Sequence, residues 1–188
     1  MRSFKWISLV LVFILVLSLQ FGCGQSKVSD TSATKSETQS DSGAIVDTSK
    51  LITKADAEAI LGEPVKEPRV NTNVMNQKIY FFDPVKQGTK VRFVQLSVVQ
   101  TAEMPEKITK YGTNAKSLFD QTTKMIEGAT PISGFGDKAV WGGHGLKVGS
   151  GLHILKGDVY LNIDVGLGDG QADLEAEKKL AKTALDRM

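Results

Sequence analysis

The stretch DVYLNIDVG, residues 158–166, decides the fold class, because apolar and polar residues alternate through it. Its two faces carry, respectively, Val159, Leu161, Ile163 and Val165, and Asp158, Tyr160, Asn162 and Asp164. A period of two residues is typical of a β-strand. Strands with one apolar and one polar face are common in antiparallel sheets, where one face packs on the core. The stretch therefore predicts an antiparallel strand with one buried face and one polar face.

Other strand-like segments flank this one, separated by glycine-rich turns. They are residues 77–83, 90–100, 137–141, 145–150 and 151–157. Within 90–100 the apolar phase shifts between Phe93 and Val94, which indicates either a bulge or a strand covered on both sides. We therefore expect a sheet of about five to six strands.

Three segments carry helix signals. Residues 51–64 begin with Thr53 as N-cap and stop at Gly62, and residues 104–127 read as helical with a break near Gly112. In residues 171–188 acidic side chains come early and basic ones late, which complements the helix dipole. The order is then α-β-β-α-β-β-β-(β)-α. Since few connections are long enough for parallel crossovers, we expect an α+β domain with a mostly antiparallel sheet and helices packed on one face.

The first 22 residues have the layout of an export signal. Arg2 and Lys5 precede an apolar run over residues 7–19, and the run ends at Gly22-Cys23. This arrangement resembles the signal of bacterial lipoproteins, in which cleavage before a cysteine leaves it as a lipid-bearing first residue. The resemblance implies that Cys23, the single cysteine of the chain, is a lipid anchor.

The alternative is an uncleaved signal anchor, because no charge occurs between Lys5 and Lys27 and that span approaches a membrane-crossing length. We favour lipidation, since Gln20 would be costly in hydrocarbon. Either way, the folded part is expected on the extracytoplasmic side of the cell membrane, held there from its N-terminus. With Cys23 consumed, no thiol remains for a disulfide, and the domain must be stable through core burial.

The mature chain divides into two parts by composition. Residues 23–48 comprise Cys23 and a Ser/Thr-rich segment with few large apolar side chains, which predicts a flexible stalk. As a coil of about 25 residues it would reach roughly 25–30 Å. Residues 49–188 have the composition and length of one globular domain.

Charge argues against nucleic acid as a partner. Without Arg2 and Lys5 of the signal, 21 basic residues balance 21 acidic ones. No Lys/Arg run and no interleaved basic and aromatic stripe occurs in the mature chain, as nucleic-acid binding would need.

No motif of catalysis or cofactor binding stands out. Residues 134–151 hold seven glycines, but an extended segment follows the Gly134-Phe135-Gly136 turn where a phosphate loop needs a helix. The two histidines, His144 and His153, could form a metal site only by converging with each other or with nearby aspartates, and the sequence spacing does not impose this. We therefore expect no catalytic residue, no metal and no cofactor.

The polar face of residues 158–166 is the best candidate for a binding site, because aromatic and carboxylate groups often line sites for polar ligands. A plain solvated sheet face is the alternative. The candidate ligand-binding residues are Trp141, His144, Asp158, Tyr160, Asn162 and Asp164.

Four segments together resemble small secreted or lipid-anchored bacterial domains of unknown function: LITKADAEAILGEPV (51–65), GFGDKAVW (134–141), LHILKGDVYLNIDV (152–165) and LAKTALDRM (180–188). The resemblance implies a cell-envelope location and carries over no catalytic residue. We expect a non-enzymatic binding or sensing domain whose ligand is a small molecule, glycan or protein. The alternatives are an envelope scaffold that docks another protein, and a hydrolase or metal-dependent enzyme that uses His144 or His153.

Overall fold

The computed structural model describes residues 44–86 and 88–188. The predicted signal peptide, Cys23 and the stalk up to residue 43 lie outside the described residues. Among the described helices, none combines the length and the apolar character that crossing a bilayer requires.

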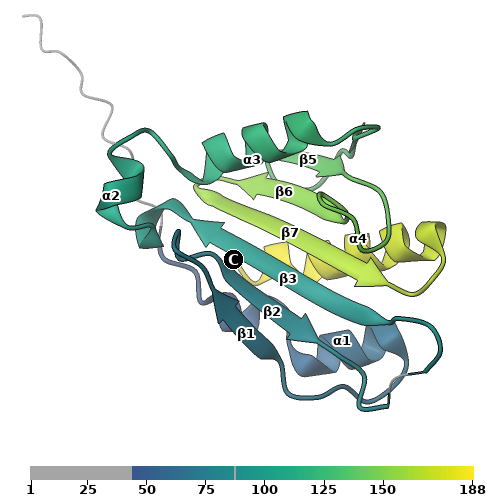
Figure 1. The fold of residues 1–188 in the computed structure, drawn as a ribbon. Helices are drawn as coiled ribbons and strands as arrows, with labels where there is room; N and C mark the ends of the chain where they lie inside the picture. Colours follow the sequence, from purple (N-terminus) through teal and green to yellow (C-terminus); the bar gives the residue numbers. More distant parts are fainter. Residues whose placement is uncertain (1–43, 87) are drawn as a thin grey trace, which may run out of the picture. The chain divides into compact units, whose positions relative to one another are not determined.

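The described residues form one antiparallel sheet in the order β1-β2-β3-β7-β6-β5-β4 (Figure 1). The strands are β1 (Arg69–Thr72), β2 (Lys78–Phe82), β3 (Phe93–Gln100), β4 (Thr130–Pro131), β5 (Lys138–Trp141), β6 (Leu152–Lys156) and β7 (Val159–Gly166). The two longest strands, β3 and β7, pair along their whole length at the centre of the sheet, with Phe93 opposite Gly166 and Gln100 opposite Val159. The sheet is therefore built around the stretch that the alternation singled out.

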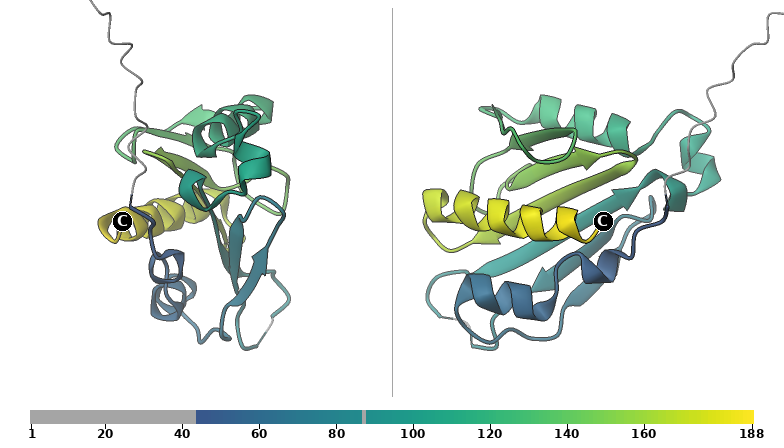
Figure 2. Two further views of the ribbon diagram at one scale, coloured as in Figure 1. Left: turned by 90° about the vertical axis from the view of Figure 1, so that its left-hand side faces the viewer. Right: turned by 180° about the vertical axis from the view of Figure 1, so that it is seen from behind.

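Helices lie on both faces of this sheet. They are α1 (Lys54–Leu61), α2 (Glu106–Thr109), α3 (Ala115–Met125) and α4 (Gly170–Asp186), with 3₁₀ turns η1 (Thr48–Lys50) and η2 (Thr101–Glu103). Figure 2 shows α1 and α4 side by side against one face, and α3 on the opposite face. We refer to these as the α1/α4 face and the α3 face.

The main hydrophobic core lies under α1 and α4. From β7 it takes Val159, Leu161, Ile163 and Val165, and from β3 it takes Val94, Leu96 and Val98. Alternate residues of a strand point to the same face, so the two central strands present a continuous apolar surface to both helices. Leu61 and Leu180 bury their side chains against it from α1 and α4.

A smaller apolar cluster lies under α3. Phe119 of α3 meets Tyr160 of β7 edge-on, with the ring centroids 5.6 Å apart. Ala115, Val99 and Leu155 complete the contact. In the described part of the chain, α3 packs mainly against β6 and β7, and no helix covers β1 and β2 on this face.

The structure confirms a mixed α+β fold with an antiparallel sheet and corrects its details. The sheet has seven strands, and the helices pack on two faces rather than one. Residues 145–150, expected as a strand, form bends and turns within a glycine-rich loop. Strands β1 and β4 were missed because β1 is exposed at every residue and β4 has only two residues, one of them proline.

The phase shift near Phe93 also has an explanation. β3 begins at Phe93, and seven of its eight residues are buried. A strand covered on both sides, one of the two alternatives, therefore accounts for the pattern.

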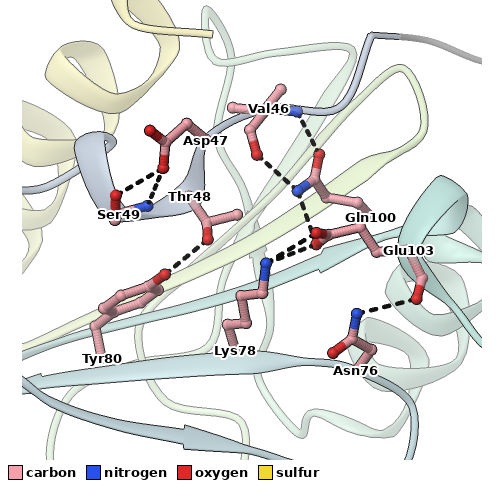
Figure 3. Close-up of polar contacts among 9 residues, drawn as sticks. All are labelled: Val46, Asp47, Thr48, Ser49, Asn76, Lys78, Tyr80, Gln100 and Glu103. Carbon is pink, nitrogen blue, oxygen red and sulfur yellow. Dashed lines mark hydrogen bonds and ion pairs between the residues drawn. The ribbon is translucent and has the colours of Figure 1, made fainter.

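The domain includes residues that composition had assigned to the stalk. The Val46 amide N–H donates to the Gln100 side chain at 2.8 Å, and the Gln100 amide donates back to the Val46 carbonyl at 2.9 Å (Figure 3). Thr48 is buried, and its hydroxyl lies 2.7 Å from the Tyr80 hydroxyl. The packed domain therefore begins before residue 49.

Candidate functional site

A cavity of about 230 Å³ opens on the α3 face, between α3 and the part of the sheet that α3 does not cover. Its polar lining residues are Gln77, Gln95, Ser97, Thr122, His153, Tyr160 and Asn162. Two of them, Tyr160 and Asn162, belong to the polar face predicted from the sequence. The cavity thus combines part of that face with side chains from three other strands or loops and from α3.

The floor of the cavity is one row of residues across four strands. In the strand pairing, Ile79 lies opposite Ser97, Ser97 opposite Asn162, and Asn162 opposite His153. Neighbouring strands of a sheet are about 4.8 Å apart, and paired residues point to the same face. The register therefore places these side chains next to one another although they are up to 83 positions apart in the sequence.

His153 and Tyr160 form a fixed hydrogen-bonded unit at one end of the cavity. The Gly149 carbonyl, 3.0 Å from His153 Nε2, can only accept, so Nε2 carries the proton. His153 Nδ1 then accepts from the Tyr160 hydroxyl at 2.7 Å. Burial lowers the pKa of His153 and raises the pKa of Tyr160 to about 12. Both rings are therefore uncharged near neutral pH.

The amide and hydroxyl groups on the other side are only partly used by the protein. Asn162 donates from Nδ2 to the Ser150 carbonyl at 3.0 Å, which leaves its Oδ1 to accept. Gln77 donates to the Ser97 hydroxyl oxygen at 2.5 Å, which leaves the Ser97 hydrogen to donate. Within residues 44–86 and 88–188, the Gln95 side chain makes no hydrogen bond. The cavity therefore offers both donors and acceptors to a ligand.

Three of the other four predicted residues lie elsewhere. Trp141 belongs to the α1/α4 side, where its Nε1 donates to Glu177 of α4 at 3.0 Å. His144 lies against Gly170 at the start of α4, and Asp158 sits in the turn before β7, where its carbonyl accepts from the Thr101 amide. The structure thus separates these side chains from Tyr160 and Asn162.

Asp164 is on the predicted face but does not line the cavity. It is 6% exposed, and its Oδ2 accepts from the Ser150 hydroxyl at 2.6 Å. Burial raises the pKa of Asp164, and the nearby charge of Asp173 acts in the same direction. Asp164 Oδ1 has no hydrogen-bond partner in the described part of the chain. Asp164 therefore belongs to the interior rather than to the site.

A second hollow of about 470 Å³ lies beside the first packed residues, and it carries charge (Figure 3). Lys78 reaches both carboxylate oxygens of Glu103, at 2.9 and 3.0 Å. The Gln100 amide also donates to Glu103, and Tyr80 is bonded to Thr48. These polar groups already bond to one another, so this hollow offers a ligand less than the cavity does.

The described part of the chain contains no recognisable metal-binding site. Residues 44–86 and 88–188 contain no group of three or more His, Cys, Asp or Glu side chains placed to hold an ion.

Comparison with protein-family models, with curated proteins and with solved structures found no match. The geometry of the cavity is therefore the basis for a functional proposal.

Sequence reasoning missed Gln77, Gln95, Ser97 and Thr122. The alternation of β3 contained a signal for two of them: Gln95 and Ser97 interrupt the apolar face opposite to Val94, Leu96 and Val98. Gln77 and Thr122 had none, because each reaches the cavity through tertiary packing.

Proposed function

We propose that this chain is a lipid-anchored protein of the bacterial cell envelope, whose domain binds a small polar ligand in the α3-face cavity without transforming it. The lipid on Cys23 would hold the domain at the extracytoplasmic surface of the membrane. The observation that carries the binding function is the concave cavity lined by seven polar side chains. Such concave sites with a few convergent polar groups are typical of ligand pockets.

The state of the two titratable cavity residues favours binding over catalysis. A general acid or base works best with a pKa near the working pH. Burial moves the pKa of His153 below its ordinary value and that of Tyr160 to about 12, away from neutrality in both cases. Both His153 nitrogens are also already hydrogen-bonded. His153 and Tyr160 therefore fix the geometry of the cavity rather than transfer protons.

Thermal unfolding of the full chain in detergent tests the binding function. The panel contains divalent metals, sugars, nucleotides, amino acids and cell-wall fragments. A ligand present at a hundred times its dissociation constant should stabilise the protein by about 2.7 kcal/mol. That corresponds to several degrees in Tm for a domain of this size. If no member of the panel raises Tm, the binding function is wrong, and an envelope scaffold becomes the better account.

Lipid labelling tests the anchor separately. Cells grown with labelled fatty acid should label the wild-type chain, and a Cys23→Ala variant should lose the label. Ser26→Ala serves as the control, because it changes a neighbouring residue and leaves the thiol in place. Labelling that persists in Cys23→Ala contradicts the lipid anchor. A wild-type chain that stays in the membrane fraction without taking up the label would indicate an uncleaved signal anchor.

A further inference from the structure

We propose that the cavity takes an uncharged ligand bearing hydroxyl or amide groups, of the size of a single sugar ring. This inference rests on the proposed binding function and names the chemical class of its ligand. Three observations carry it: the absence of charge in the lining, the unused hydrogen-bonding groups, and the size of the cavity.

The cavity lining carries no formal charge. Besides the seven polar residues, the lining consists of Met75, Ile79, Val99, Leu118 and Gly149, and no Asp, Glu, Lys or Arg occurs in it. The hydrogen bonds from Nε2 to Gly149 and from Tyr160 to Nδ1 suit the neutral form of the His153 ring. A charged group that leaves water without a partner of opposite charge loses its hydration without compensation. The lining therefore selects against phosphate, carboxylate and ammonium groups.

Hydroxyl and amide groups match what the protein leaves unused. Gln95 offers a donor and an acceptor, Asn162 offers Oδ1 as an acceptor, and Ser97 offers its hydroxyl hydrogen. A hydroxyl group both donates and accepts, so a polyhydroxylated ring can satisfy all three. An apolar ligand would leave these groups without partners, which costs binding energy.

The volume and the apolar walls of the cavity limit the size of the ligand. A water molecule takes about 30 Å³ of liquid, so about 230 Å³ holds roughly seven or eight waters. That is below the range of about 300–1,000 Å³ typical of drug-sized ligands. The apolar side chains Met75, Ile79 and Leu118 can contact the C–H face of a sugar while the row of polar groups meets its hydroxyls.

Sugars that share one ring and differ in charge test the inference. Binding to the full chain in detergent is measured by calorimetry for glucose and N-acetylglucosamine, which are neutral, and for glucosamine and glucuronate, which are charged. We expect a neutral sugar to bind and its charged counterparts to bind at least about tenfold more weakly. The affinity of the neutral sugar should be almost independent of salt, because screening acts on charges.

A variant that leaves the fold intact tests whether the sugar binds in this cavity. Gln95→Ala removes an amide that makes no hydrogen bond among the described residues, so the stability should change little. Loss of one or two ligand hydrogen bonds should weaken neutral-sugar binding by about tenfold. Asn71→Ala is the matched control, since Asn71 is exposed on β1 beside Ile79 and does not line the cavity.

The outcomes separate this inference from the binding function. If a charged sugar binds as tightly as its neutral counterpart, or if only metals, nucleotides or amino acids of the broader panel bind, the inference is wrong and the binding function stands. If nothing binds in either experiment, both are wrong. Equal binding by wild type and Gln95→Ala places the ligand outside this cavity and overturns the inference as well.

Discussion

Raising the pH from about 5 to about 9 is expected to lower the free energy of unfolding by several kcal/mol. The cause is Glu177 of α4, whose side chain is fully buried. Burial raises the pKa of Glu177 from 4.5 to about 9, and the nearby Asp164 and Asp173 act in the same direction. The folded protein therefore keeps a proton that the unfolded chain releases above pH 4.5. The stability is full below that pH and is lost as the pH rises towards 9.

The variant Glu177→Gln should remove most of this slope, because an amide does not ionise in this range. The loss of one hydrogen bond should also cost the variant some stability at every pH. Glu177 accepts hydrogen bonds from Trp141 Nε1 at 3.0 Å and from the Val165 amide at 3.2 Å, and Gln has only one acceptor oxygen. An unsatisfied buried donor costs about 1–3 kcal/mol. The variant should thus be less stable than wild type near pH 5 and more stable near pH 9.

Urea unfolding at a series of pH values measures this crossing. Glu175→Gln is the control, because Glu175 lies on the same helix with an exposed side chain, and among the described residues its ion pair is with Lys178. It should leave the slope unchanged. A Glu177→Gln curve parallel to that of wild type would mean that Glu177 is ionised in the folded protein, which contradicts the account.

The variant Gly142→Ala is expected to lower the free energy of unfolding by about 2–4 kcal/mol. Gly142 closes the glycine-rich loop: its amide donates to the Gly151 carbonyl at 2.9 Å. A Cβ at this position would lie 1.7 Å from the Gly149 carbonyl oxygen. Since that contact is with backbone, the loop must open. Opening it also takes the Gly149 carbonyl away from His153, so sugar binding should weaken together with stability.

Gly145→Ala is the matched control in the same loop. Its φ of +91° disfavours alanine, but no atom lies within 4 Å of the added Cβ. Its cost should be about 1–2 kcal/mol, from the backbone alone. Thermal unfolding and sugar binding are measured for both variants. A Gly142→Ala protein as stable as Gly145→Ala would show that the loop does not close as described.

The sequence was sufficient for the parts of the fold that have a regular pattern. Alternation identified β7, and the expected N-cap at Thr53 identified α1, where the structure also shows Asp56 returning a hydrogen bond to form a reciprocal cap. The second helical face was missed for a physical reason. Tyr160 reads as a polar position in the alternation, yet its ring packs on Phe119, so α3 covers a face that the pattern marked as solvated.

The candidate site could be predicted only in part, because the residues that line it come together through strand register. Tyr160 and Asn162 were found from the pattern of a single strand. Ser97 and His153 become their neighbours through pairing with β3 and β6, which no local signal specifies. Trp141 was expected near this face if the strands paired consecutively. β5 does pair with β6, and β6 with β7, but the Trp141 side chain points to Glu177 on the other face.

The most direct test of the central claim is an NMR titration of the ¹⁵N-labelled chain in detergent with N-acetylglucosamine. The side-chain amides of Gln77, Gln95 and Asn162 give their own signals and line the cavity. We expect saturable shifts of these signals and of the Gly149 backbone amide, with little change at Gln100 beside the charged hollow. Shifts centred on Gln100 and Val46, or no saturable shift at all, would contradict the claim that this cavity binds an uncharged sugar.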